Sequence, residues 1–308
     1  MNMIKTHTNT AEIVFMWWNT SLSPVAKRNR ASSDELKFAS LMVNSFIHQY
    51  KADCVCLAEI SVEDAEFIFE SCALEGFELY NGNAVAGRTS FDTFVIYNVR
   101  KMVISDANAI TYTKRKKTLK VAQNINFVNT LDGEVFNLFI SHWPSRLWCE
   151  KNSADRSFLG IRLRDEIEKL NVSGNVGNVI VMGDFNDEPF DVSLSDHLMA
   201  TRDLHVAIAD STVLYNPFWR YMCNRSTYKK GYNDESQSGT YYYKGGDVSK
   251  WCTFDQVIVS PVFLGKSCWH LVEDRVQIIS IPEYLPLVLN KNTIFDHMPI
   301  MAVFERNT

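Results

Sequence analysis

The sequence contains no apolar run that approaches the roughly 20 residues of a membrane-spanning helix. Its first residues, from Met1 to His7, also lack the apolar segment of a secretory signal peptide. These two absences predict a protein without a membrane span or a signal peptide.

Cysteine spacings typical of metal sites or disulfide frameworks are missing as well. The seven cysteines are odd in number, no Cys-x-x-Cys pair occurs, and only Cys54 and Cys56 are close neighbours. Those two lie in an apolar run, where cysteine behaves as a small core residue. We therefore expect reduced thiols and a cytoplasmic location.

An excess of positive charge is also absent, because the net charge is −5 at pH 7 and the isoelectric point is about 5.8. This balance excludes a basic module that coats a polyanion along its whole surface. Any contact with nucleic acid must then be local. Basic residues gather at 27–30 and at 114–117, with Lys120 close by, although charge runs of this kind more often form solvated loops.

Size and composition favour one large folding unit. The 308 residues are 46% hydrophobic, which is enough for a large core. No composition break, internal repeat, heptad array or low-complexity tract divides the chain. We expect a single domain over residues 1–308, with residues 1–10 as a flexible end.

Short apolar runs that carry polar residues at one end recur along the chain. The run at residues 179–182 predicts a buried strand, and Asp184 and Asn186 follow it at once. A strand end is a rigid support at the rim of a sheet, which suits residues that carry chemistry. Such groups occur at six predicted strands, as Asn19, Glu59, His142, Asp184 with Asn186, Asp255, and Asp296 with His297.

Other segments predict the elements between these strands. Apolar residues at helical spacing predict helices near residues 35–50, 62–74 and 154–170. Short strands between residues 77 and 140 predict successive antiparallel hairpins. Residues 191–252 are the hardest to interpret, and we expect a mobile loop there, whose aromatic residues pack against the sheet or stack on a base.

The strand-end residues resemble, in order and over nearly the whole chain, the motif series of the endonuclease/exonuclease/phosphatase superfamily. The segments that carry the resemblance are Trp18-Asn19, Leu57-Ala58-Glu59, Ser141-His142, Gly183-Asp184-Phe185-Asn186-Asp187, Phe254-Asp255 and Asp296-His297. The His-Trp-Pro-Ser-Arg run that starts at His142 is similar to bacterial members. The resemblance implies an α/β (α+β) fold of deoxyribonuclease I type, a four-layer sandwich of two packed mixed β-sheets flanked by helices. It also implies Mg²⁺-dependent hydrolysis of a phosphate ester.

The residue types suit that chemistry on their own. Hydrolysis of a phosphodiester needs a hard cation on a phosphate oxygen, for which Glu59 is a suitable ligand. Asn19 can bind the metal or orient Glu59, and Asp296 can approach the same cation. We expect Mg²⁺, for which Mn²⁺ can substitute.

The remaining groups can act on water and phosphate. Asp184 can deprotonate or align the attacking water, and Asn186 can donate to a phosphate oxygen or fix that water. His297 can donate to the phosphate while Asp255 holds its other ring nitrogen.

The resemblance extends to the residues around His142. In deoxyribonuclease I-like members a second histidine protonates the leaving oxygen, and His142 stands at that position, with Asp92 as a candidate to orient it. Ser145, Arg146 and Arg156 match positions of bacterial members where an arginine can clamp a phosphate. The abasic-site enzymes usually have a tyrosine in place of His142.

The sequence narrows the substrate only in part. Residues 182–187 and 252–256 depart from the signatures of the inositol polyphosphate 5-phosphatases, and the signal sequence and apolar hairpin of secreted sphingomyelinases are not evident. We therefore predict a nuclease that acts on DNA or RNA, without a predictable protein partner. A phosphatase or phosphodiesterase on a small-molecule or lipid phosphate ester is the alternative, followed by a non-catalytic binding domain.

Overall fold

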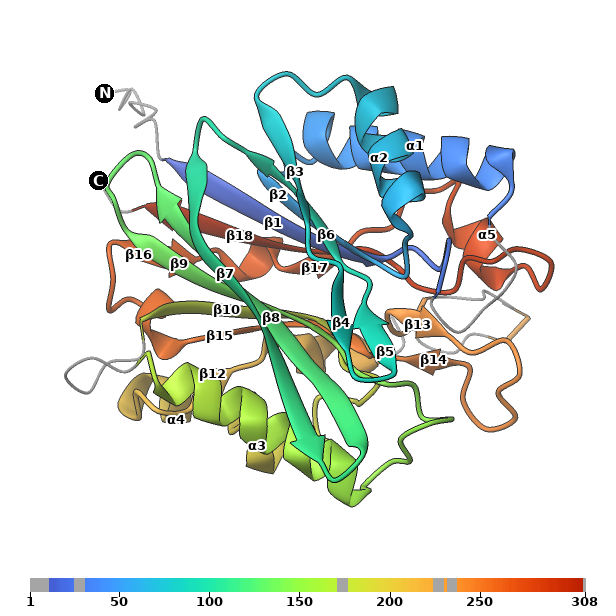
Figure 1. Ribbon diagram of the computed structural model, residues 1–308. Coiled ribbons are helices and arrows are strands. Elements are labelled where there is room, and N and C mark those ends of the chain that lie inside the picture. Colours follow the sequence, from blue (N-terminus) through green and yellow to red (C-terminus); the bar gives the residue numbers. More distant parts are fainter. Residues whose placement is uncertain (1–10, 25–30, 171–176, 224–229, 232–236, 307–308) are drawn as a thin grey trace.

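The computed structural model describes residues 11–24, 31–170, 177–223, 230–231 and 237–306. Two seven-stranded sheets pack face to face, and helices cover the outer face of each sheet (Figure 1). The predicted four-layer α/β sandwich is therefore confirmed. Predictions on residues 1–10, on the basic residues 27–30 and on residues 224–229 and 232–236 of the 191–252 region lie outside the described residues.

The first sheet has the strand order β16-β18-β1-β2-β6-β3, and β17 also pairs with β18. Strand β1 runs parallel to β2 and antiparallel to β18. The bounds are β1 Glu12–Asn19, β2 Cys54–Ala58, β3 Phe77–Asn81, β6 Phe94–Asn98, β16 Trp269–Leu271, β17 Gln277–Ile278 and β18 Ile300–Arg306.

The second sheet has the order β11-β12-β15-β10-β9-β8-β7. Its strands are β7 Met102–Lys114, β8 Lys117–Asn129, β9 Val135–His142, β10 Asn178–Asp184, β11 Ala200–Thr201, β12 Leu214–Tyr215 and β15 Asp255–Val259. Two small hairpins complete the strands, β4 Ala84–Ala86 with β5 Thr89–Phe91, and β13 Tyr241–Tyr242 with β14 Trp251–Cys252.

Helices α1 and α2 lie on the first sheet, and α3 and α4 lie on the second (Figure 1). Helix α1 begins with a capping box, in which Ser32 and Glu35 bond each other's backbone amides. The helices are α1 Ser33–His48, α2 Val62–Cys72, α3 Ala154–Glu168, α4 Leu204–Ala209 and α5 Leu285–Leu289. Short π or 3-10 turns are η1 Ser193–His197, η2 Pro217–Met222, η3 Pro261–Phe263 and η4 Glu273–Arg275. Among the described helices, none has the length and apolar character needed to cross a membrane.

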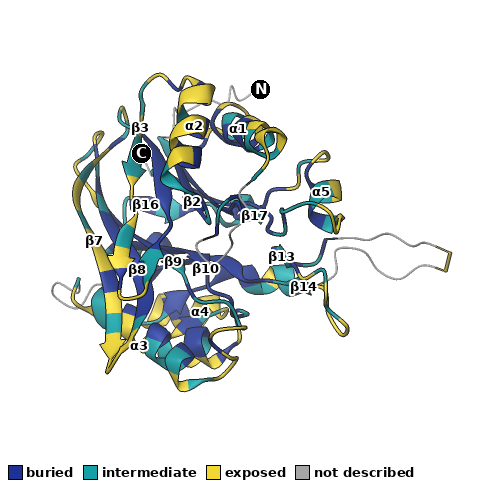
Figure 2. Cartoon of the chain, turned by 45° about the vertical axis from the view of Figure 1, so that its right-hand side comes forward, coloured by how far each residue is buried: buried dark blue, intermediate teal, exposed yellow. Residues whose placement is uncertain are grey.

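Strand β10 lies between two hydrophobic cores, which explains why its segment of the sequence is apolar without interruption. Ile180 and Met182 point into the large core between the two sheets, whereas Val179 and Val181 point into a second core against α3. Successive side chains of a strand face opposite sides, so a strand buried on both faces needs apolar residues at every position. Figure 2 shows this strand buried along its length. The buried strand therefore holds Asp184 at a fixed place.

Two predicted boundaries are wrong in ways that matter for the site. The segment at 114–120 is not a loop, because Lys117 and Lys120 belong to β8 and only residues 115 and 116 form the turn. The last strand begins at Ile300, so Asp296 and His297 lie in the segment before it. The first error arises because β7 and β8 are strands of thirteen residues each. Their polar residues face solvent, so the sequence does not reveal how long the two strands are.

Gly183 is required by the approach of β9 to β10, and its replacement tests this packing. Its φ is 149°, and an added Cβ would lie 1.8 Å from the carbonyl oxygen of Ser141. We expect Gly183→Ala to lower the free energy of unfolding by ~3 kcal/mol or more, measured by urea denaturation. Gly133→Ala is the control, since φ is 77° and no atom lies within 4 Å, and it should cost only ~1 kcal/mol. Equal losses in the two variants would contradict the clash.

Candidate active site

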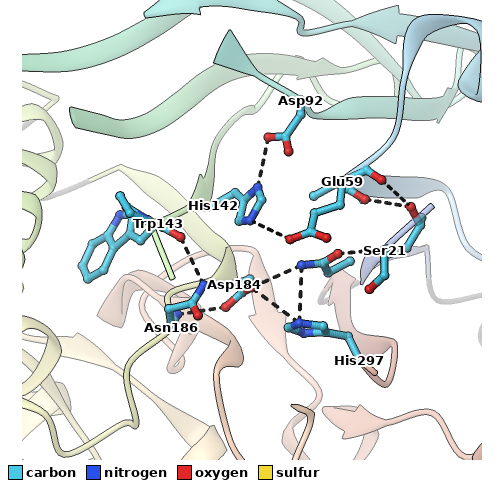
Figure 3. Close-up of polar contacts among 12 residues, drawn as sticks. Ser21, Glu59, Asp92, His142, Trp143, Asp184, Asn186 and His297 are labelled. Carbon is cyan, nitrogen blue, oxygen red and sulfur yellow. Dashed lines mark hydrogen bonds and ion pairs between the residues drawn. The ribbon is translucent and has the colours of Figure 1, made fainter. Parts of the chain in front are cut away.

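The polar ends of several strands meet at one edge of the sandwich, with Asp184 at their centre (Figure 3). In the second sheet, Asp184 at the end of β10 is opposite His142 of β9 and Asp255 of β15. From the first sheet, the side-chain amide nitrogen of Asn19, the last residue of β1, donates to Asp184 Oδ2 at 3.2 Å. The strand-end residues therefore form a cluster that joins both sheets.

The loops leaving these strands hold three residues in the left-handed backbone region. The φ angle is 54° at Ser21, 52° at Glu59 and 51° at Asn186. Such conformations cost non-glycine residues ~1–3 kcal/mol each and cluster at functional sites. Asn186 is held by Asp184, whose two carboxylate oxygens accept from its backbone N at 2.8 Å and its side-chain Nδ2 at 3.1 Å. The left-handed backbone at Asn186 thus aims its side chain at Asp184.

His297 is fixed by Asp255 on one side and faces Asp184 on the other. Its Nδ1 lies 2.8 Å from Asp255 Oδ2, while Asp255 Oδ1 accepts from the indole nitrogen of Trp17 at 2.7 Å. Its Nε2 lies 3.8 Å from Asp184 Oδ2. Burial alone would lower the pKa of His297, but the charges of Asp255 and Asp184 outweigh burial and raise it to about 10. These charges favour the protonated ring, whose Nε2 faces Asp184 and lies 3.5 Å from Nδ2 of Asn19.

Asp184 is an almost completely buried carboxyl group. Burial raises its pKa above the ordinary value, and the positive charge of His297 only partly offsets this effect. A buried carboxylate needs hydrogen bonds to remain charged, and Asn19 and Asn186 supply them. Among the described residues, no arginine or lysine bonds Asp184, so its hydrogen bonds come from the two asparagines.

His142 forms a second pair with an aspartate. Its Nδ1 lies 3.0 Å from Asp92 Oδ1, and its Nε2 lies 3.5 Å from Glu59 Oε1. Burial would lower the pKa of His142, but Asp92 and Glu59 raise it to about 10. For Glu59, burial would raise the pKa, yet the hydrogen bond and charge of His142 lower it. Lys120 donates to the same Asp92 oxygen at 3.1 Å, so Asp92 is shared by two cations.

The residues predicted to hold a metal occupy different positions around the cluster. Glu59 contacts His142 through one carboxylate oxygen, and the other oxygen has no hydrogen bond in the described part of the chain. Asn19 turns its amide nitrogen toward Asp184 and its oxygen toward the backbone N of Ser21. Asp296 accepts a hydrogen bond from Ser21 Oγ. Of the three, Glu59 has a carboxylate oxygen without a hydrogen bond to the described residues, which suits it best to hold a cation.

Ligand-type atoms of Asp184, Asp255 and His297 also lie within 4.8 Å of one another. Three such groups can in principle hold a cation. However, Asp255 already bonds Nδ1 of His297 and the indole of Trp17 with its two oxygens. A protonated imidazole also repels a cation, so we interpret this triad as a hydrogen-bonded relay.

The predicted substrate-binding arginines differ in position. Arg146 lies at the rim, with Nε bonded to the carbonyl of Asn186 at 2.9 Å and Nη2 to Asp191 at 2.8 Å, and its guanidinium covers the ring of Phe254 at 4.5 Å. Its Nη1 makes no hydrogen bond to the described residues. Ser145 is partly exposed in the same loop.

The prediction that Arg156 binds substrate is wrong. Arg156 is 1% exposed, and its guanidinium donates to the backbone carbonyls of Pro144, Cys149 and Phe185. The pocket of about 200 Å³ that it lines, with Asp187 and Ser193 among the other lining residues, includes no residue of the Asp184 cluster. Arg156 therefore holds the loops that follow β9 and β10 together. Sequence proximity to Arg146 could not reveal this, because α3 carries Arg156 beneath those loops.

Two residues at the site were not predicted from the sequence. Lys120 is 8% exposed and bonds Asp92; the signal was a lone lysine directly before an apolar run. Tyr241 packs its ring 4.6 Å from the His297 ring and 5.3 Å from the Phe254 ring. Tyr241, one of the aromatic residues in 191–252, therefore covers one side of the imidazole.

Comparisons with known proteins place this geometry in context. A model of the Endonuclease/Exonuclease/phosphatase family matches residues 80–285. No curated protein sequence matches the chain.

Solved structures match over nearly the whole chain. The catalytic domain of human Nocturnin with bound sulfate is 17% identical, with 96% of this chain and 95% of that one covered and a TM-score of 0.61. The mannosyl-6-phosphatase Bt3783 of Bacteroides thetaiotaomicron is 15% identical, with coverages of 95% and 99% and a TM-score of 0.60. TDP2 of D. rerio, solved with a single-strand DNA product, is 15% identical, with coverages of 97% and 100% and a TM-score of 0.58. At these identities the likeness shows the shared fold.

Proposed function

We infer that this chain, which belongs to the endonuclease/exonuclease/phosphatase family, hydrolyses phosphodiester bonds of DNA or RNA with the help of Mg²⁺. One observation carries the inference: a buried Asp184 lies between two histidines, each paired with its own aspartate. Hydrolysis of a phosphodiester needs a proton acceptor for water, a donor for phosphate and an acid for the leaving oxygen. The cluster contains one candidate for each task.

The division of labour follows from the contacts. Asp184 and Asn186 hold and orient the attacking water, because both have polar atoms directed into the cluster. His297 donates its Nε2 proton to a non-bridging oxygen of the phosphate, while Asp255 prevents the ring from turning. His142, fixed by Asp92, gives its Nε2 proton to the leaving oxygen.

The donor set fits a hard divalent cation. Glu59 has a carboxylate oxygen without a hydrogen bond to the described residues, and the neighbouring Asn19 and Asp296 add oxygen donors of the type that Mg²⁺ prefers. When bound, Mg²⁺ would supply charge neutralisation to a phosphate oxygen. We assign Glu59 as the principal ligand, with Asn19 and Asp296 as further ligands, directly or through water.

The second histidine favours an ester whose leaving group is a sugar hydroxyl, as in a nucleic-acid strand. A sugar hydroxyl is a poor leaving group and needs protonation, which His142 can provide. Human Nocturnin, a mannosyl-6-phosphatase and a TDP2 bound to single-strand DNA share the fold, so the fold alone leaves the substrate open. Ser145 and Arg146, at the rim, are our candidates for contact with the substrate's phosphates.

Hydrolysis of a substrate panel tests the proposed function. The panel holds supercoiled plasmid, single-stranded DNA, RNA and bis-p-nitrophenyl phosphate, each with Mg²⁺ or with EDTA. We expect Mg²⁺-dependent cleavage that falls at least ~1,000-fold in His297→Ala, since a preorganised donor to the phosphate is lost.

His270→Ala is the matched control, because His270 lies on β16 beside Glu305 and away from the cluster. It should keep wild-type rates. Cleavage of the small diester alone would replace the nuclease by an enzyme of small phosphate esters. Cleavage that is insensitive to EDTA, or equal losses in both variants, would contradict the site.

The acid role of His142 predicts a dependence on the leaving group. His142→Ala should lower kcat/KM by ~100-fold or more on a dinucleotide, whose leaving oxygen needs a proton, and by less than ~10-fold on bis-p-nitrophenyl phosphate. Steady-state kinetics on both substrates measure the difference. Asp92→Asn should show the same preference in weaker form. An equal loss on both substrates would show that His142 is not the acid.

A further inference from the structure

The tip of the β7–β8 hairpin is a basic projection of the second sheet. Pairing of β8 with β9 begins at Gln123, so residues 117–122 of β8 extend beyond that pairing. All four residues from Lys114 to Lys117 are exposed, and the tip lies against the end of α3 (Figures 1 and 2). The hairpin thus presents positive charge on a protein whose net charge is −5.

Two of these cations anchor the tip to α3. Lys114 Nζ lies 4.6 Å from the ring centre of Phe158, and Lys117 forms an ion pair with Asp155. Leu119 is buried against the same helix. The turn residues Arg115 and Lys116, in contrast, form no ion pair with any described residue. Their side chains are exposed to solvent at a hairpin tip that is anchored to α3.

The backbone of the turn does not favour the residue that it contains. The φ of Arg115 is 56°, and Lys116 is not among the residues with positive φ. Left-handed geometry at the first residue of a two-residue hairpin is that of a type II′ turn, where glycine is strongly preferred. Arginine occupies a position where it is strained and glycine would not be. Such strain often occurs at functional positions, which suggests a function for Arg115.

The neighbouring hairpin adds a third cation. Gly87, in the β4–β5 turn, is packed so closely on β8 that an added Cβ would lie 2.7 Å from Thr118 Oγ1. Arg88 follows it, is exposed, and forms no ion pair with the described residues. Arg88, Arg115 and Lys116 together are called the basic tip below.

The basic tip is connected to the candidate active site along β8. Thr118 and Lys120 lie on one face of β8, and Lys120 bonds Asp92, the partner of His142. At about 3.4 Å per residue, Lys117, the first residue of β8, lies ~10 Å from Lys120, and the turn residues Arg115 and Lys116 lie beyond it. A nucleic-acid duplex advances by ~10 Å in about three steps of 3.4 Å.

We propose that the basic tip binds the phosphate backbone of a nucleic-acid substrate a few nucleotides away from the phosphate that is cleaved beside His142. The inference rests on the proposed function in taking nucleic acid as the substrate. It adds the surface that the polymer follows, from Lys120 along β8 to the turn. Small diesters do not reach this surface.

Binding of a fluorescein-labelled 20-nucleotide DNA in EDTA, followed by anisotropy, tests the inference without turnover. The variant is Arg115→Gly with Lys116→Gln, which removes two charges and gives the turn its preferred residue. We expect at least ~10-fold weaker binding at 50 mM NaCl. The slope of log K against log salt should become shallower by roughly 1.4, at ~0.7 per phosphate contact of a single strand. Arg88→Gln should weaken binding in the same direction.

Lys51→Gln with Lys266→Gln is the matched control. It removes the same charge from exposed lysines that precede β2 and follow β15, at the opposite ends of these strands from Glu59 and Asp255. The control should bind like the wild type, and a similar weakening in both double variants would overturn the proposal. So would unchanged binding in the basic-tip variant.

Two further measurements separate this proposal from the proposed function. Thermal unfolding of the variant with Arg115→Gly and Lys116→Gln should occur at the wild-type temperature or above it. Weaker binding could then not come from a damaged fold. Hydrolysis of bis-p-nitrophenyl phosphate should be unchanged in this variant. If the variant hydrolyses this diester normally and its DNA binding is unchanged, only the basic-tip proposal is contradicted. If the wild type cleaves no member of the panel, yet the variant binds DNA more weakly than the wild type does, only the proposed hydrolysis is contradicted.

Discussion

The hydrogen bond from Asn19 to Asp184 is the interaction on which the site depends, because it joins the two sheets at the point where their polar strand ends meet. A buried carboxylate is costly unless its oxygens accept hydrogen bonds. Asn19 supplies one bond from the first sheet, and Asn186 supplies two from the loop after β10. The position of Asp184 therefore depends on the face-to-face packing of the two sheets.

The two histidines are arranged around this carboxylate in the same way. Each ring has one nitrogen held by a buried aspartate and the other directed into the cluster. The aspartates belong to different elements, the segment before β6 for Asp92 and the start of β15 for Asp255. In the mechanism that we propose, the two rings perform different tasks with similar chemistry, His297 on the phosphate and His142 on the leaving oxygen.

Much of this arrangement could be predicted from the sequence, because strand β10 and its neighbours combine an apolar run with a polar end, and both features are local. The non-local features could not. Arg156 is buried beneath loops that only the folded chain brings over it, and it bonds their backbone carbonyls. Lys120 reaches Asp92 through the pairing of β7 with β8, whose polar outer face hides the length of both strands. Tyr241 covers His297 because of a bridge between distant segments.

The binding of Mg²⁺ measured by titration calorimetry is the most direct test that these strand-end groups form one metal-dependent site. We predict saturable binding to the wild type and an affinity at least ~10-fold lower in Glu59→Gln, which removes the ligand charge but keeps the shape of the side chain. Glu66→Gln, at an exposed position of α2, should bind like the wild type. Equal affinity in all three proteins, or no binding by the wild type, would contradict the account.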